Sequence, residues 1–231
     1  MIGVVVPAHN EEAHIGACLR SLLRAAQCPQ LNGEKVFAVV VLDGCTDATE
    51  AVANALGVMT VAVQARNVGV ARARGSQIAL DAGVRWLAFT DADSTVAPDW
   101  FAAQLALGSD AVCGTVAVAD WGLYGDPMRR HFAATYTDAD GHRHIHGANL
   151  GVSARAYRSV GGFQALATSE DVALVTALRA NGASISWSAS PRVTTSARRQ
   201  FRAPGGFGAT LERVHREAPS LCPNGSPLAT Q

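Results

Sequence analysis

The chain has 231 residues, of which 48% are hydrophobic and 16% are charged, and its 19 basic residues balance its 19 acidic ones. This composition is typical of a globular domain with a full core and excludes a disordered chain. The neutral balance gives no electrostatic footprint for nucleic acid or for an anionic membrane surface, so we expect neither as a partner. No apolar run approaches the length of a membrane span, so we expect no integral membrane segment.

The cysteine pattern and the first residues of the chain indicate the cellular compartment. Five cysteines are scattered along the chain without C-x-x-C spacing: Cys18, Cys28, Cys45, Cys113 and Cys222. An odd number with this spacing argues against a disulfide framework or a zinc site and favours a reducing compartment. The chain begins directly on a strand-like run, which leaves no room for a signal peptide. We therefore expect a cytoplasmic protein.

Apolar runs alternate with helical periodicity over the first half of the chain. Buried strands are predicted at residues 2–6, 36–42, 58–63 and 86–89. After the first strand a helix with one apolar face is expected, with Asn10 as its cap and Glu11 and Glu12 in its first turn. Strands that alternate with helices imply a parallel sheet with right-handed crossovers. We therefore predict an α/β fold with a mostly parallel central sheet flanked by helices on both faces.

The second half of the chain has a less regular pattern. A helix is predicted over 98–107 and a strand over 111–118, followed by residues 119–145, which have no clear period. A segment of this kind inside a compact domain is typical of a functional loop. A helix capped by Ser169-Glu170-Asp171 is expected to stop at Gly182, and a short strand follows over 185–187.

Two carboxylates directly follow the strand at 86–89. Asp91 and Asp93 are separated only by Ala92, so on extended backbone both can face one ligand. Ligands of open α/β sheets bind outside the carboxyl ends of the strands, and Mg²⁺ or Mn²⁺ takes one or two carboxylates plus substrate oxygens. The alternative is that Asp93 or Ser94 caps the next helix and that Asp91 is a solvated loop residue.

Five short motifs in chain order resemble those of family 2 glycosyltransferases, which have the GT-A (Rossmann-like) fold. They are Val5-Val6-Pro7-Ala8-His9-Asn10-Glu11-Glu12, Asp43-Gly44-Cys45-Thr46-Asp47, Asn67-Val68-Gly69 with Ala73-Arg74, Asp91-Ala92-Asp93, and Ser169-Glu170-Asp171. Cys45 departs from the pattern, in which serine is usual. The resemblance implies one GT-A domain over residues 1–231, with a nucleotide-sugar-binding half at 1–118 and an acceptor-binding half with a C-terminal lid at 119–231.

The resemblance also implies an inverting, metal-dependent transferase that moves a hexose from a nucleoside-diphosphate sugar to a small or soluble acceptor with a free hydroxyl. The cofactor would be Mn²⁺ or Mg²⁺, with Asp93 as the direct ligand and Asp91 at the ribose or a metal-bound water. Residues of the donor site would be Pro7, Ala8, Asn10, Glu11, Asp43, Arg74, Asp91, Ala92 and Asp93. Arg74 would donate two parallel hydrogen bonds to the diphosphate. The alternative is that it is a solvated charge on the helix surface. Helix capping is the alternative for Asp43, and the interpretation we prefer for Asp47.

On the acceptor side, the resemblance makes Asp171 the candidate general base. Inverting transfer needs a carboxylate that takes the proton of the acceptor hydroxyl as this hydroxyl attacks the anomeric carbon. Glu170 and Asp171 lie in the first turn of a helix, where the dipole favours negative charge. The alternative is that both residues only complement that dipole.

The remaining candidates would line the sugar and acceptor pocket. His146, Gly147 and Asn149 offer close backbone approach and hydrogen bonds to hydroxyls, and a metal pair of His144 and His146 lacks an evident third ligand. Trp121 either stacks on a sugar or anchors its loop in the core. Two arginines beside a Gly-Gly hinge either clamp the diphosphate or form a solvated basic run: Arg199 and Arg202.

Three competing functions would need other sequence features. A sugar nucleotidyltransferase would want a glycine-rich, basic loop after the first strand, where this chain has His9-Asn10-Glu11-Glu12. A non-catalytic nucleotide-sugar-binding domain would not need all four carboxylates at 91, 93, 170 and 171. A dinucleotide oxidoreductase is disfavoured because no G-x-G-x-x-G follows the first strand. A homodimer is compatible with all of these features.

Overall fold

The computed structural model describes residues 1–197 together with residues 212, 214 and 216, apart from the side chain of Leu123. The chain divides into two compact units. The larger unit contains Met1–Ala117 and Asp138–Thr195, and the smaller unit contains Val118–Thr137 and Ser196–Gln231. These units are not the two halves, 1–118 and 119–231, of the predicted domain, and that assignment of binding roles stays a prediction.

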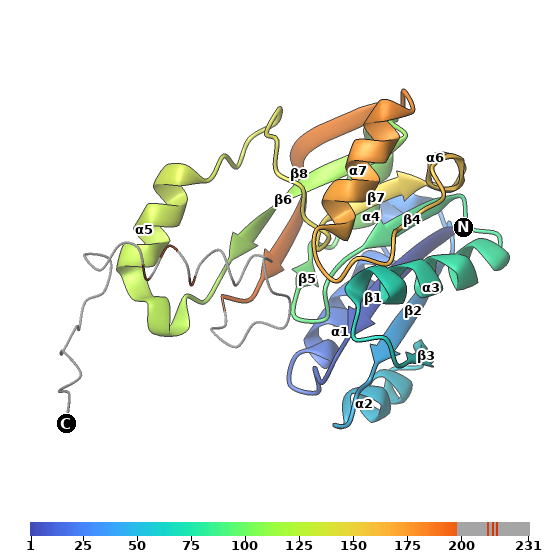
Figure 1. Cartoon of the computed structure of the whole chain (residues 1–231), viewed down its shortest axis with the longest axis horizontal. Coiled ribbons are helices and arrows are strands. Elements are labelled where there is room, and N and C mark those ends of the chain that lie inside the picture. The colour runs from blue at the N-terminus through green and yellow to red at the C-terminus, as the bar shows by residue number, and fades with distance from the viewer. Residues whose placement is uncertain (198–211, 213, 215, 217–231) are drawn as a thin grey trace. The chain divides into compact units, whose positions relative to one another are not determined.

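An eight-stranded sheet forms the centre of the fold, in the order β3-β2-β1-β4-β7-β6-β8-β5 (Figure 1). Its strands are β1 (Ile2–Ala8), β2 (Val36–Asp43), β3 (Met59–Val63), β4 (Trp86–Phe89), β5 (Thr95–Val96), β6 (Ala111–Val118), β7 (Leu150–Ser153) and β8 (Ile185–Thr195). The first four strands are parallel, as predicted, but β7 runs antiparallel to both β4 and β6, and β5 runs antiparallel to β8. The sheet is therefore mixed, and the prediction of a mostly parallel sheet is wrong.

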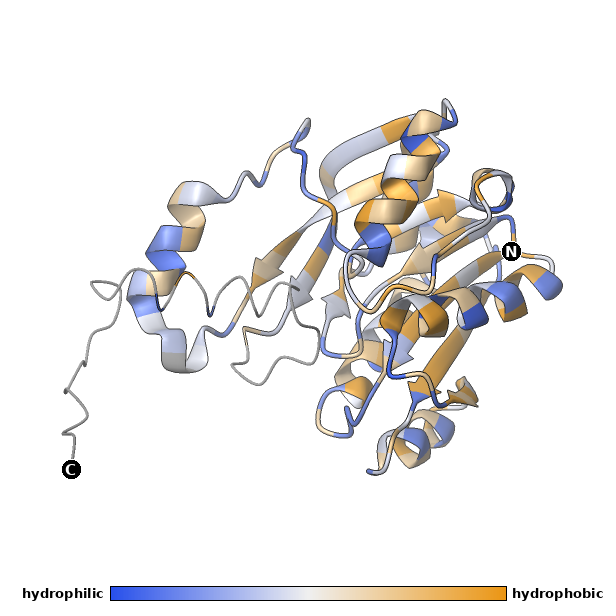
Figure 2. Cartoon of the chain, in the orientation of Figure 1, coloured by the Kyte–Doolittle hydropathy of each residue, from blue (hydrophilic) through white to orange (hydrophobic). Residues whose placement is uncertain are grey.

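Helices pack on both faces of the sheet. In the larger unit they are α1 (Ile15–Ala25), α2 (Thr49–Ala55), α3 (Val68–Asp81), α4 (Trp100–Ala106), α6 (Ala154–Ser159) and α7 (Glu170–Ala180), with a short 3₁₀ turn at Pro29–Leu31. The smaller unit contains α5 (Gly125–Thr135) and a 3₁₀ turn at Gly122–Tyr124. Alternate residues of each strand point to opposite faces, so Val5 belongs to the core shared with α3 and α7, whereas Val4 faces α1. Figure 2 shows that the central strands are predominantly hydrophobic while α2 and α5 carry hydrophilic residues.

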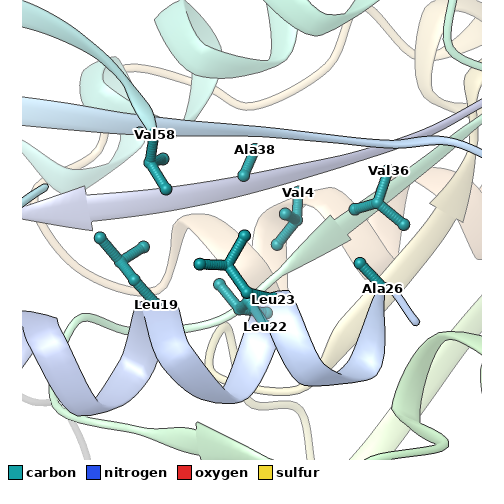
Figure 3. Close-up of a pocket in the computed structure, with 8 residues that line it drawn as sticks. All are labelled: Val4, Leu19, Leu22, Leu23, Ala26, Val36, Ala38 and Val58. Atoms are coloured by element: carbon teal, nitrogen blue, oxygen red, sulfur yellow. The ribbon is translucent and has the colours of Figure 1, made fainter. Parts of the chain in front are cut away.

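A small void lies between α1 and the sheet (Figure 3). Its volume is about 30 Å³. It is lined by aliphatic side chains of α1, of β1 and β2, and of Val58, which directly precedes β3. A space of this size holds at most a water molecule, and an apolar lining offers that water no partners. We therefore interpret it as a packing gap and not as a substrate site.

Three local predictions are corrected by the structure. Asn10 does not cap α1, which begins five residues later at Ile15; Asn10 instead adopts a positive φ of 53°. Glu11 and Glu12 therefore lie before the helix and outside its first turn. The strand predicted at 185–187 extends to Thr195, because pairing with β5 and β6 continues through small and polar residues that carry little strand signal.

The segment 119–145 also contains a helix that was not predicted. Helix α5 contributes Met128 and Phe132 to a small cluster within the smaller unit, where they pack with Trp121 and Tyr124 from the preceding 3₁₀ turn and its N-cap position. The period was hidden because glycine, proline and charged residues interrupt it. No helix among the described residues is long and apolar enough to cross a membrane.

Candidate active site

The D-x-D stretch lies in the loop that leaves the buried strand β4. The Asp91 side chain is 39% exposed, whereas Ala92 is buried beneath the loop. Asp93 is partly buried, and its Oδ1 lies 3.4 Å from the Ser94 hydroxyl oxygen. That hydroxyl donates to Oγ1 of Thr195 at 2.9 Å. The next helix begins only at Trp100, after β5, so neither Asp93 nor Ser94 is its cap. Helix capping therefore does not account for Asp93.

The turns that follow β1 and β2 are tied to each other. Oδ1 of Asn10 accepts from the backbone N–H of Thr46 at 2.7 Å, and the N–H of Glu11 donates to the Thr49 hydroxyl at 2.7 Å. Oδ2 of Asp47 accepts from the N–H of Glu12 at 3.0 Å, while its Oδ1 accepts from the N–H of Thr49 at 3.0 Å. Asp47 thus lies one residue before the N-cap, Ala48, and accepts from the N–H of the first residue of α2. Asn10 and Glu11 join the turn after β1 to the turn after β2.

Asp43 is the last residue of β2, and both oxygens of its buried carboxylate accept hydrogen bonds from backbone N–H groups. Its Oδ1 accepts from the N–H groups of Ala65 and Arg66 at 2.8 and 2.7 Å, and its Oδ2 accepts from Asn67 N–H at 2.7 Å. These bonds hold the loop that enters α3. The neighbouring Pro7 and Ala8 lie at the end of β1, opposite Val41 and Leu42 of β2. All these residues meet at the carboxyl edge of the parallel strands, where the sequence predicted them.

The guanidinium that contacts the D-x-D loop belongs to Arg72, two residues before Arg74, whose contact with a diphosphate stays a prediction. Arg74 is exposed on α3, whereas Arg72 is 3% exposed. Nη2 of Arg72 donates to Oδ1 of Asp91 at 2.6 Å, and its Nη1 pairs with Oε1 of Glu170. The helical period could have predicted that Arg72 is buried, whereas the motif indicated only Arg74. The residues that share the buried face of α3 include Gly69, Arg72, Gly75, Ser76 and Ala79.

The predicted acceptor-side carboxylates lie in the first turn of α7. Glu170 is buried, and burial raises the pKa of its carboxyl, while the charge of Arg72 acts to lower it. Asp171 is partly buried; its Oδ2 accepts from Gly147 N–H at 2.7 Å and its Oδ1 from Val172 N–H at 2.8 Å. Asp91 of the D-x-D stretch and Glu170 of α7 thus share one buried guanidinium, that of Arg72.

A histidine row runs along the extended segment that leads to Gly147. The rings of His142 and His144 are 5.4 Å apart between centroids and 17° apart in plane, and those of His144 and His146 are 5.8 Å and 24° apart. This stacking does not bring a third ligand to a pair of His144 and His146. The described residues include no group of three or more histidine, cysteine or acidic side chains arranged to hold a metal ion.

The pKa of His146 falls to about 4, chiefly through burial and the neighbouring His144. Because an unfolded histidine titrates near 6.5, the unfolded chain binds the extra proton first as the pH falls. The stabilisation that comes from keeping His146 neutral is therefore complete above pH 6.5 and is lost as the pH falls to 4. The free energy of unfolding decreases by about 3 kcal/mol over this range. Between pH 7 and pH 4.5, the free energy of unfolding measured in urea should fall more for wild type than for His146→Gln. Equal losses in both proteins would contradict this assignment.

Asn149 is completely buried, and its side chain is occupied within the protein. Its Oδ1 accepts from Trp100 Nε1 at 2.8 Å, and its Nδ2 donates to the carbonyl groups of Thr115 and Pro191 at 2.7 and 2.8 Å. Both amide hydrogens are therefore used. The predicted contact from Asn149 to a sugar hydroxyl is replaced by a structural role, because this amide joins α4, β6 and β8.

The other predicted pocket residues lie in the smaller unit or outside the described part of the chain. Trp121 is buried and its ring centroid lies 5.3 Å from that of Phe132, which fits the alternative that it anchors its segment. Arg199, Arg202 and the Gly-Gly hinge fall among residues that are not described, so their predicted clamp stays a prediction.

Comparisons with known proteins give a consistent result. The model of the family described as glycosyl transferase family 2 matches residues 3–161, more than half of the chain. Comparison with the curated proteins gives no match.

Solved structures share the fold at low sequence identity. TarS 1–349 from S. aureus in complex with UDP-GlcNAc is 17% identical with a TM-score of 0.64, over 92% of this chain and 64% of that one. The mannosyltransferase PcManGT from Pyrobaculum calidifontis with GDP-Man and Mn²⁺ is 18% identical, with a TM-score of 0.65 and coverages of 98% and 65%. Glucosyl-3-phosphoglycerate synthase from Mycobacterium tuberculosis, with Mn²⁺, UDP and phosphoglyceric acid, is 20% identical, with a TM-score of 0.59 and coverages of 98% and 80%. The chain thus spans just under two thirds of the length of the first two.

Proposed function

Because the chain belongs to glycosyl transferase family 2, we propose that it transfers a hexose, with inversion, from a nucleoside-diphosphate sugar to the hydroxyl of a small or soluble acceptor. One observation carries the proposal: Arg72 pairs with both Asp91 and Glu170, so the D-x-D loop and the first turn of α7 meet at one place. A transferase needs this juxtaposition, because the leaving diphosphate and the attacking hydroxyl lie on either side of one anomeric carbon.

On the donor side, Asp93 and Asp91 would hold Mn²⁺ or Mg²⁺. Their oxygen donors suit these hard cations, which keep the remaining coordination positions for water and phosphate. When bound, such a cation neutralises the negative charge that gathers on the leaving diphosphate. Two of the similar structures contain Mn²⁺, which supports this choice of cation.

On the acceptor side, Asp171 would act as the general base. The acceptor oxygen forms its bond to the anomeric carbon while the bond from that carbon to the diphosphate oxygen breaks, and the hydroxyl proton passes to Asp171. The N–H groups of Gly147 and Val172 orient this carboxylate and stabilise its negative charge. One displacement of this kind inverts the configuration at the anomeric carbon.

A thermal-shift panel tests the donor and metal sites together. UDP, GDP, ADP, CDP and dTDP are each added with and without Mn²⁺ to wild type, to Asp93→Ala and to the control Asp99→Ala, an exposed carboxylate whose side chain makes no capping bond. A nucleotide present at 100 times its Kd stabilises the native state by about 2.7 kcal/mol. For a chain of this length that is a rise in Tm of roughly 5–11 °C.

We expect one nucleotide to raise the Tm only with Mn²⁺, in wild type and Asp99→Ala but not in Asp93→Ala. The absence of a shift with every nucleotide would contradict the proposed donor site, and with it the alternative of a non-catalytic nucleotide-sugar-binding domain. A metal-dependent shift that survives in Asp93→Ala would contradict the assignment of the metal site.

A further inference from the structure

Arg72 carries the network that joins the two carboxylate motifs. The motif comparison had pointed to Ala73-Arg74, yet Arg74 is exposed while Arg72 lies beneath the site. The planar guanidinium sends one terminal nitrogen to Asp91 in the loop after β4 and the other to Glu170 at the start of α7. A rigid fork of this kind can fix two separate carboxylates at a set spacing, which a flexible ammonium does less well.

The fold is shaped around this guanidinium. It lies over the ring of Phe163, with 5.8 Å from Cζ to the ring centroid. A Cβ at Gly147 would overlap with Nη1, so only glycine lets the backbone pass at this point. That same backbone donates its N–H to Asp171. The cation, the loop at Gly147 and both acidic residues of α7 are thus in direct contact.

Stability alone gives a poor reason for this arrangement. Removing a guanidinium and a carboxylate from water costs several kcal/mol per ion, and apolar replacements of a buried ion pair are often neutral or stabilising. Burial of Glu170 at 4% exposure is such a cost. Asp91, by contrast, keeps 39% of its side chain exposed, with one oxygen on Arg72.

We infer that Arg72 is a positioning residue, which fixes the D-x-D loop relative to the first turn of α7 and so sets the distance between the donor side and the general base. The inference rests on the proposed function for its catalytic consequence. By holding Oδ1 of Asp91, Arg72 orients the other carboxylate oxygen; by holding Glu170, it fixes the turn that carries Asp171. Arg72 itself touches neither reacting group.

The first test needs no ligand. Hydrogen exchange is measured on the unliganded protein for Arg72→Lys and Arg72→Met, with Arg74→Lys and Arg74→Met as matched controls on the same helix. We expect faster exchange in peptides over residues 88–95 and 168–174 for both Arg72 variants, and wild-type exchange for both Arg74 variants. Unchanged exchange at both segments in Arg72→Lys, the variant that keeps the charge, would overturn the inference.

The second test compares the effect of Arg72→Lys on kcat with its effect on Tm. If Arg72 positions the site, Arg72→Lys should keep a Tm close to that of wild type, yet lose about 10²-fold in kcat and need more Mn²⁺ for half-maximal rate. A merely structural ion pair would be rescued by lysine in kcat as well as in Tm, and that result would also overturn the inference. Failure of wild type to bind any nucleotide would refute the proposed function, while the exchange experiment would still decide the role of Arg72.

Discussion

Replacing Asp171 with asparagine is expected to lower kcat by about 10²–10⁴-fold, because the side chain can no longer accept the proton of the acceptor hydroxyl. Donor affinity should be unchanged, since the proposed cation and nucleotide contacts lie on other residues. Initial rates and a nucleotide titration on the same preparation measure the two effects. Asp99→Asn serves as the control for a change of charge at an exposed site.

The fold of the Asp171→Asn variant needs its own check. Asp171 accepts from two N–H groups through two oxygens, whereas asparagine has only one oxygen to offer. The variant should therefore lose a little stability, which a measured Tm separates from the loss of turnover. Wild-type turnover in a folded variant would remove Asp171 from the mechanism.

Gly69→Ala is expected to destabilise the protein, although alanine is favoured over glycine by about 1 kcal/mol inside a helix. The reason is a backbone contact: a Cβ at Gly69 would come 2.7 Å from the carbonyl oxygen of Leu166 and 2.8 Å from its nitrogen, and would overlap with the carbonyl of Gln164. Backbone cannot yield as a side chain does, so overpacking should cost about 1–3 kcal/mol or more. The measurement is the free energy of unfolding in urea.

The same substitution should also reduce turnover. The loop that contacts Gly69 runs directly into α7, and the N–H of Gly69 donates to Leu166 O at 3.1 Å. Pushing this loop away displaces Glu170 and Asp171. Gly108→Ala is the control, because a Cβ there meets nothing within 4 Å and pays only the strain of a positive φ of 63°. A Gly69→Ala variant that is more stable than wild type would contradict the packing described for this loop.

The parallel half of the sheet could be read from the sequence because its strands are continuous apolar runs. Residues 2–6, 36–42 and 86–89 are hydrophobic on both faces, which only a sheet covered by helices requires. The order of strands and turns then delivered Asp43, Asp91 and Asp93 to one edge. Here local pattern and tertiary structure agree.

The antiparallel half could not be read in the same way. Strand β7 is only four residues long and contains a glycine, so its strand signal is weak, and it forms because β4 and β6 offer partners on both sides. Likewise, the positive φ of Asn10 depends on the turn after β2, which is 36 residues away in the sequence. Pairing between distant segments leaves no mark in a local window.

The choice between Arg72 and Arg74 shows how two sequence signals can disagree. The motif pointed to Arg74, while the buried face of α3 contains Arg72. Burial of an arginine is uncommon, so a solvated position was the natural expectation for either residue. Arg72 is the buried one of the two, and two carboxylates from distant segments compensate its charge.

The most direct test of the central claim is to follow sugar release by ¹H NMR from UDP-GlcNAc and from GDP-mannose with Mn²⁺, in water and with a panel of soluble alcohols and sugars. We predict that wild type releases or transfers the sugar of one donor, and that the product first seen has the anomeric configuration opposite to that of the donor. Asp171→Asn should form almost none. A product that retains the donor configuration would contradict single displacement with Asp171 as the base, and the absence of product from either donor would contradict the predicted turnover.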